Sequence, residues 1–171
     1  MAIWMWMMLL IIISQRLGEL VIAKNNEKWM KERGGIELGE GHYKWFIILH
    51  VFFFVSLFFE STIYNQVNRS LNYLLLFLFI VTQLGRVWCI ASLGRFWNTK
   101  IIILPNVTLI RNGPYKYVKH PNYIIVGMEL LIIPLMFGSY ITAIVFPVLH
   151  YILLRVRIPK ENKALESVSL N

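Results

Sequence analysis

The chain has 171 residues, enough for one ordinary domain, and 57% of them are hydrophobic while only 15% are charged. A soluble globular chain is about 45–50% apolar, so this composition excludes an ordinary soluble domain and indicates an integral membrane protein. The formal net charge of +8 would suit a nucleic-acid-binding protein, but Lys and Arg also gather in the cytoplasmic loops of membrane proteins.

Five apolar segments predict helices that cross the membrane or nearly do so. A bilayer core about 30 Å thick needs roughly 20 apolar residues in a helix. The first segment lacks the basic start and the small-residue cleavage site of a signal peptide, so we expect a retained span. The last two segments are short, and Gly138-Ser139 between them predicts a helical hairpin. The predicted spans are residues 2–23, 43–63, 71–93, 123–137 and 140–154.

The basic residues alternate between successive loops. The first loop, the third loop and the C-terminal tail together contain 14 of the 17 Lys and Arg residues, whereas the second loop contains only Arg69. The positive-inside rule then places the N-terminus outside the cell and both the third loop and the tail in the cytoplasm. We therefore predict a multi-pass protein of the cell membrane and no nucleic-acid partner.

The one sizeable segment outside the spans runs from Gly94 to Pro121. It contains the apolar runs Ile101–Leu104 and Val107–Ile110 on either side of Pro105-Asn106. Two β-branched runs around such a turn predict a short hairpin, and a plain re-entrant connector is the alternative. The expected fold is an all-α integral membrane domain over residues 1–171, with about five transmembrane helices and a short cytoplasmic β-hairpin-like connector.

Ionisable residues within membrane spans are costly and tend to be functional. Arg16 and Glu19 are three residues apart, so they can pair on one face of a helix, either structurally or as part of a site. Arg86 and Glu129 are candidates to pair across helices. Two further residues, expected to be hydrogen-bonded or interfacial rather than metal ligands, are His50 and His150. The sequence contains no HExxH motif or carboxylate cluster that indicates a metal, and no GxSxG motif that indicates a serine nucleophile.

The densest group of polar and aromatic residues is GPYKYVKHPNY, from Gly113 to Tyr123. Interfacial aromatic rings with snorkelling lysines at the start of a helix would explain much of it. A second polar cluster follows the fifth span and comprises Arg155, Arg157, Lys160 and Glu161. Because the fourth and fifth spans form a hairpin, we expect both clusters to meet on the cytoplasmic face. Together they offer a cation, a carboxylate, an imidazole and phenols, which could hold a zwitterionic aromatic cofactor.

The order GPYxYxxHPNY, a helical hairpin and then RIxxE followed by Ala-Leu resembles the isoprenylcysteine carboxyl methyltransferase family of integral membrane enzymes. The stretch from Leu93 to Pro105 is similar to the bacterial branch of that family. The resemblance covers about residues 86–165, and the two motifs at this separation are specific as a pair. It implies a compact helical membrane fold that binds S-adenosylmethionine on the cytosolic side. It also implies a lipid acceptor that enters sideways from the bilayer.

The resemblance further implies roles for particular residues, in a cofactor region at about residues 94–123 and 155–165. The family's arginine beside the acceptor falls on Arg157, and Arg95 is a weaker candidate for the acceptor side. The implied cofactor-binding residues are Val107, Thr108, Leu109, Ile110, Tyr115, His120, Pro121, Asn122, Tyr123 and Glu161. The chain departs from the family pattern at Lys119, where arginine is usual, and at Asn162, where a second glutamate is usual. These departures affect the identity of the acceptor more than the binding of the cofactor.

The expected reaction is S-adenosylmethionine-dependent O-methylation of an acidic oxygen, a carboxylate or an enol or pyrone hydroxyl, on a lipid-like acceptor. An acceptor that is already ionised needs positioning more than it needs a strong base. Members of the bacterial branch are associated with alkylpyrone O-methylation, so a long-chain pyrone hydroxyl is the first expectation. One alternative is an NAD(P)H-dependent membrane reductase of related fold, although no nicotinamide motif is obvious. Another is a small transporter or scaffold, although the polar residues crowd one end of the chain's helices rather than both halves.

Overall fold

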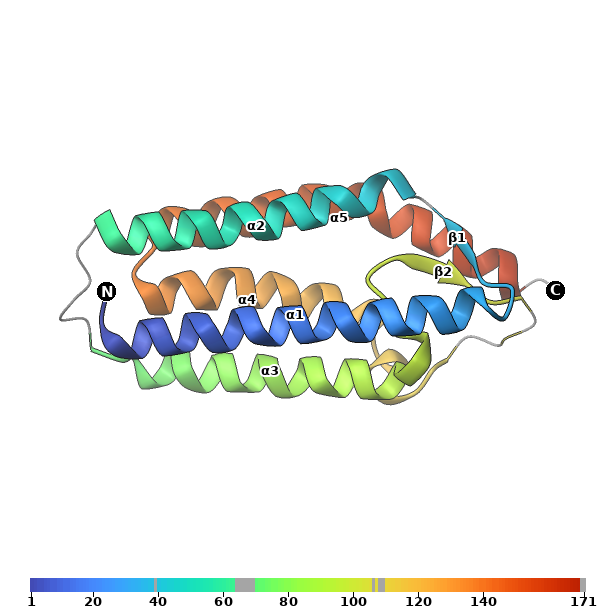
Figure 1. The fold of residues 1–171 in the computed structure, drawn as a ribbon, viewed down its shortest axis with the longest axis horizontal. Coiled ribbons are helices and arrows are strands. Elements are labelled where there is room, and N and C mark those ends of the chain that lie inside the picture. The colour runs from blue at the N-terminus through green and yellow to red at the C-terminus, as the bar shows by residue number, and fades with distance from the viewer. Residues whose placement is uncertain (39, 64–69, 106, 108–109, 170–171) are drawn as a thin grey trace.

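The computed structural model describes residues 1–38, 40–63, 70–105, 107 and 110–169. In this part of the chain, five helices of 17 or more residues lie side by side along the long axis of the molecule (Figure 1). They are α1 (Ile3–Lys31), α2 (Glu40–Ile63), α3 (Tyr73–Leu93), α4 (Pro121–Phe137) and α5 (Tyr140–Ser169). Single 3₁₀ turns at Gly94–Phe96 and Gly113–Lys116 flank the connection between α3 and α4. The predicted all-α architecture with about five helices is confirmed.

Helix length and composition identify a multi-pass membrane protein. Among the described residues, four segments are long and apolar enough to cross a bilayer, namely Ile3–Lys31, Tyr43–Ile63, Tyr73–Phe96 and Tyr140–Glu166. α4, with 17 residues, is shorter. Large apolar side chains such as Leu10, Phe52, Phe77 and Ile144 are exposed on the outside of the bundle. Lipid rather than water is the solvent in which such a surface is stable.

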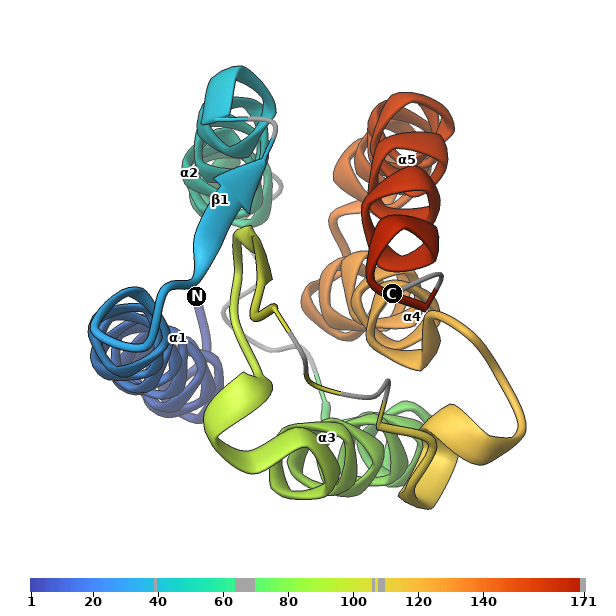
Figure 2. The same cartoon turned by 90° about the vertical axis from the view of Figure 1, so that its right-hand side faces the viewer.

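A two-stranded β element lies at one end of the bundle (Figures 1 and 2). β1 (Ile36–Leu38) pairs antiparallel with β2 (Ile101–Ile103), and Ile36 is opposite Ile103. The short β connector is therefore present, and its second strand comes from the loop between α1 and α2. Most of the turn and run predicted to follow Pro105, namely Asn106, Thr108 and Leu109, lies outside the described residues. Lys100, next to β2, donates to Glu37 of β1 at 3.3 Å, an ion pair between distant segments that local sequence patterns do not reveal.

The hairpin predicted at Gly138-Ser139 is confirmed, because Gly138 ends α4 in the left-handed conformation with φ of 73°. α5 then begins against a carboxylate from α2. The two oxygens of Glu60 accept hydrogen bonds from the backbone N–H groups of Ile141 and Thr142, each at 2.8 Å. These N–H groups have no partner within their own helix, and a negative charge at a helix start is favourable. Glu60 therefore fixes α5 against α2.

The hydrophobic core occupies the half of the bundle away from the β element. Its largest fully buried side chains include Met5, Phe53, Leu57 and Phe137. The rings of Phe53 and Phe146 meet edge to face with centroids 5.5 Å apart, which joins α2 to α5. The other half of the bundle, toward the β element, contains a cavity with polar residues on its wall.

Candidate functional site

A cavity of about 800 Å³ lies between the helices and the β element, within the usual size range of ligand sites. Its lining is polar toward the segment that precedes α4 and apolar between α1 and α2. Leu17 and Leu20 of α1 and Ile47 and Val51 of α2 line it and are all exposed. The side of the cavity between α1 and α2 is therefore open rather than sealed by packed side chains. Figure 2 shows these two helices standing apart at this end, with β1 between them.

Four residues on the cavity wall form one connected group, which we call the α4–α5 cluster: His120, Tyr123, Arg157 and Glu161. The hydroxyl of Tyr123 donates to Oε2 of Glu161, and Nε of Arg157 donates to the Tyr123 oxygen at 2.9 Å. Nη2 of Arg157 also donates to the backbone carbonyl of Thr99 at 2.7 Å. The structure thus brings together the two polar clusters, through residues such as Tyr123 and Glu161 that are 38 positions apart in sequence.

His120 lies between two acceptors at the start of α4. Its Nδ1 is 3.4 Å from Oε1 of Glu161, its Nε2 is 2.9 Å from Oδ1 of Asn162, and its ring stacks on Tyr123 with centroids 5.5 Å apart. Burial lowers the pKa of His120, but the contacts with Glu161 and Asn162 raise it more, so the pKa lies above its ordinary value. Asn162 therefore serves as a hydrogen-bond partner of His120.

We expect His120 to make the stability of the protein depend on pH. Because folding raises its pKa, protonated His120 stabilises the folded state fully below the ordinary value of about 6.5. That stabilisation is lost as the pH rises through the higher pKa of the folded state. Thermal unfolding in detergent should show a midpoint that falls over this range, with a smaller fall in His120→Gln. A slope that the substitution leaves unchanged would contradict the assignment.

Most of the other predicted cofactor residues also reach the cavity, and those that line it are Val107, Ile110, Tyr115 and Asn122. Thr108 and Leu109 lie outside the described residues. Pro121 is buried in the first turn of α4 and is not part of the lining. Tyr115 lies two residues after Gly113, which has φ of 55°. A Cβ atom added to Gly113 would lie 2.0 Å from Oγ of Ser92. Only glycine fits there, so the turn that presents Tyr115 requires it.

The two predicted acceptor-side arginines are placed differently. Arg157 lines the cavity, and its guanidinium carbon is 5.3 Å from the centre of the Phe46 ring. Arg95 is exposed, lies with its guanidinium carbon 5.7 Å from the centre of the Trp29 ring, and is not part of the lining. The structure therefore brings one of the two arginines to the cavity.

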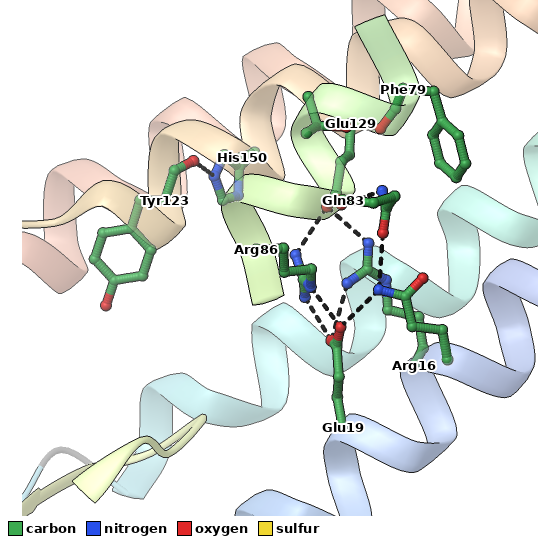
Figure 3. Close-up of polar contacts among 10 residues, drawn as sticks. Arg16, Glu19, Phe79, Gln83, Arg86, Tyr123, Glu129 and His150 are labelled. Atoms are coloured by element: carbon green, nitrogen blue, oxygen red, sulfur yellow. Dashed lines mark hydrogen bonds and ion pairs between the residues drawn. The ribbon is translucent and has the colours of Figure 1, made fainter. Parts of the chain in front are cut away.

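A second polar group lies deeper in the bundle (Figure 3). We call it the buried ion network, and it comprises Gln15, Arg16, Glu19, Gln83, Arg86 and Glu129. Arg86 donates to both oxygens of Glu19, at 2.6 and 2.7 Å, and to Glu129 at 2.8 Å. Arg16 donates to Glu19 at 2.9 Å and to Glu129 at 2.7 Å. The predicted pairs Arg16–Glu19 and Arg86–Glu129 are confirmed, but single pairs do not reveal that the four residues form one network.

The buried ion network joins α1 to α3 and α4. Its two guanidinium groups and two carboxylates cancel in formal charge, which is the arrangement that makes charges tolerable inside a membrane. Arg16, Glu19 and Arg86 also line the cavity, so the network forms its floor. Glu129 is six residues beyond Tyr123 on α4, which places the floor about 9 Å deeper than the α4–α5 cluster.

The two histidines within the spans are hydrogen-bonded, as predicted. Nδ1 of His50 is 2.7 Å from the backbone oxygen of Phe46, and Nε2 of His150 is 3.2 Å from that of Tyr123, the latter drawn in Figure 3. Both rings line the cavity. Among the described residues, His, Cys, Asp and Glu form no group of three or more that could hold a metal ion.

Comparisons with known proteins converge on one family and on bacterial relatives. The model of the Isoprenylcysteine carboxyl methyltransferase (ICMT) family matches residues 74–167, which include the α4–α5 cluster. The uncharacterized protein YpbQ of Bacillus subtilis (strain 168) is 41% identical over 165 residues, which are 96% of this chain and 98% of that protein. An uncharacterized protein of Haemophilus influenzae is 31% identical over 160 residues, 90% of each chain. The similarity to the Bacillus protein extends over α1 and α2, which precede the family match.

Proposed function

Because the chain belongs to the isoprenylcysteine carboxyl methyltransferase family, we propose that this membrane protein uses S-adenosylmethionine to methylate an acidic oxygen of a lipid-like acceptor. The observation that carries the proposal is the α4–α5 cluster on the wall of the cavity, inside the region that the family model matches. The distribution of basic residues supports an orientation with this end of the bundle in the cytoplasm and the N-terminus outside. We treat residues 1–171 as one methyltransferase domain.

The donors and acceptors of the cavity fit S-adenosylmethionine. Oδ1 of Asn122 is buried and has no hydrogen-bond partner among the described residues, so a ligand with an N–H donor would satisfy it. Glu161 offers a carboxylate for a cationic group, and the rings of Tyr115, His120 and Tyr123 line the same space. The cofactor carries an ammonium group, an adenine amino group and a flat ring, which are the complementary features. Val107 and Ile110, on the same lining, would contact its edges.

Bound in this way, S-adenosylmethionine would supply a methyl group that is activated on a sulfonium sulfur. Glu161 would hold the positively charged part of the cofactor, and its hydrogen bond from Tyr123 fixes the orientation of the carboxylate. Arg157 is held by Tyr123 and Thr99, so its guanidinium group has a defined place from which to orient the acceptor oxygen. A low-water cavity that aligns two reactants removes much of the entropic cost of their reaction.

The acceptor class follows from the apolar side of the cavity. Leu17, Leu20, Ile47 and Val51 form an open apolar wall that suits an alkyl chain lying between α1 and α2. The reactive group of such a molecule would be a carboxylate or an enol or pyrone hydroxyl. A long-chain alkylpyrone is the first candidate, because the bacterial branch that the sequence resembles is associated with alkylpyrone O-methylation.

The proposal is tested by measuring binding of S-adenosylhomocysteine to the detergent-purified protein. Wild type should bind in the micromolar range, and Glu161→Gln should weaken binding tenfold or more, equivalent to about 1.4 kcal/mol. Glu166→Gln is the matched control, since it is an exposed glutamate of the same helix, and it should bind like wild type. Absence of binding by folded wild type would contradict the proposal and favour the reductase or scaffold alternatives.

A further inference from the structure

His50 presents a hydrogen-bond acceptor to the cavity. Its Nδ1 is 2.7 Å from the carbonyl oxygen of Phe46, and a carbonyl oxygen can only accept a hydrogen bond. In the neutral imidazole the single N–H is therefore on Nδ1, and Nε2 has a free lone pair. Nε2 is at the far end of a ring that lines the cavity, and it forms no hydrogen bond with a described residue.

The position of His50 is close to the proposed acceptor site. Phe46 stacks beneath the guanidinium group of Arg157, and His50 is four residues further along α2. Four residues are about one helical turn, so His50 lies about 6 Å deeper than Phe46, toward the buried ion network. An acceptor whose oxygen is oriented by Arg157 would thus have His50 on its membrane side, next to the apolar wall from Ile47 and Val51.

His150 is the other histidine within the spans, and its free nitrogen is less accessible to a ligand than that of His50. His150 has its own carbonyl partner through Nε2, which leaves Nδ1 as its free nitrogen. That nitrogen is buried without a partner, and the residue is only 3% exposed. His50 is the more accessible of the two, and its free nitrogen is at the outer end of the ring.

We propose that Nε2 of His50 accepts a hydrogen bond from a hydroxyl group of the acceptor, and takes its proton as the methyl group is transferred. This inference rests on the proposed function and selects, between its two acceptor classes, a neutral enol or pyrone hydroxyl over a carboxylate; an alkylphenol serves as a probe of such a hydroxyl. A hydroxyl can donate to the lone pair of Nε2, whereas an ionised carboxylate would face that lone pair with its own. A site built around a lone pair discriminates strongly against a group that cannot donate to it.

The proton transfer is balanced within the site. The proton leaves the hydroxyl oxygen for Nε2, an electron pair of that oxygen forms the bond to the methyl carbon, and the electrons of the broken carbon–sulfur bond stay on sulfur. The positive charge on sulfur disappears as the positive charge on the imidazole appears, so the total charge of the site does not change. The imidazolium releases this proton to water before the next turnover.

Binding provides the first test, with the protein saturated with S-adenosylhomocysteine. The Kd of a long-chain alkylphenol and of the fatty acid of equal chain length is measured for wild type, His50→Phe and Phe52→Leu. His50→Phe should weaken phenol binding about tenfold while fatty acid and S-adenosylhomocysteine bind as in wild type. Phe52→Leu, which changes an exposed ring on the same helix, should change none of the three. Equal effects of His50→Phe on phenol and fatty acid would overturn the inference.

Turnover provides the second test. His50→Gln should lower kcat for the neutral alkylphenol about 100-fold or more, the usual contribution of a positioned base. It should lower kcat less than about threefold for an alkylated nitrophenol that is already ionised at the assay pH, because no proton then has to be removed. Equal losses on both acceptors, or no loss, would refute the role of His50. Wild type that binds no S-adenosylhomocysteine would instead refute the proposed function itself.

Discussion

Replacing Arg86 with leucine should lower the free energy of unfolding by about 3–5 kcal/mol, because it leaves buried carboxylates without their main partner. Arg86 makes three of the charged hydrogen bonds in the buried ion network, and its side chain is only 6% exposed. Arg16 would remain as the single cation facing both Glu19 and Glu129. Equilibrium unfolding in mixed detergent micelles would measure the loss.

Two further variants separate charge pairing from simple loss of packing. The double variant Arg86→Leu with Glu19→Leu keeps the neutral pair Arg16–Glu129, so it should be more stable than Arg86→Leu alone. Lys28→Met removes an exposed lysine 4.0 Å from Glu32 and should change stability by less than about 1 kcal/mol. If Arg86→Leu lowers the free energy of unfolding no more than Lys28→Met does, the buried ion network does not stabilise the fold.

Substitution of Arg157 with alanine should lower kcat/KM for the methyl acceptor about 100-fold, while the affinity for S-adenosylhomocysteine stays within about threefold. The expected loss is that of an orienting group whose absence lets the acceptor leave its reactive position. Arg157→Lys should recover little, because a lysine ammonium cannot hold the planar geometry in which Arg157 bonds Tyr123 and Thr99 at once. Methyl transfer from labelled S-adenosylmethionine into a lipid acceptor measures the rate.

Arg155 is the matched control for Arg157. It is two residues away on the same helix and exposed, and it donates to Tyr151 of its own helix at 3.2 Å without lining the cavity. Arg155→Ala should therefore methylate like wild type. Turnover by Arg157→Ala at the rate of Arg155→Ala would remove Arg157 from the acceptor site.

Hydropathy located all five helices, yet it did not predict where the first and last would end. The predicted spans stop at residues 23 and 154, whereas α1 continues to Lys31 and α5 to Ser169. An apolar run marks the part of a helix that crosses the lipid. Hydropathy therefore does not detect the polar turns that continue the helix beyond that run. The extension matters for the site, because Arg157 and Glu161 lie within α5 and their four-residue spacing is that of one helical face.

Pairing between distant segments was equally beyond the sequence pattern. Local turn residues predict a hairpin of Ile101–Leu104 with Val107–Ile110 around Pro105-Asn106. In the structure, Ile101–Ile103 pairs with Ile36–Leu38, a segment more than 60 residues earlier in the chain. The pairing of the strands depends on where the helix ends place the loops. No local sequence pattern predicts those positions.

The sequence by itself determined the membrane class, the helical hairpin at Gly138-Ser139 and the polar residues of the α4–α5 cluster. It could do so because apolar length, turn residues and motif order are local properties. Only the tertiary structure decided that Arg16, Glu19, Arg86 and Glu129 form one neutral network, that Arg157 and not Arg95 reaches the cavity, and that His50 presents a free nitrogen to it. The physical reason is that each of these results depends on the rotation of one helix about its axis relative to another. That rotation is set by the packing of the whole bundle.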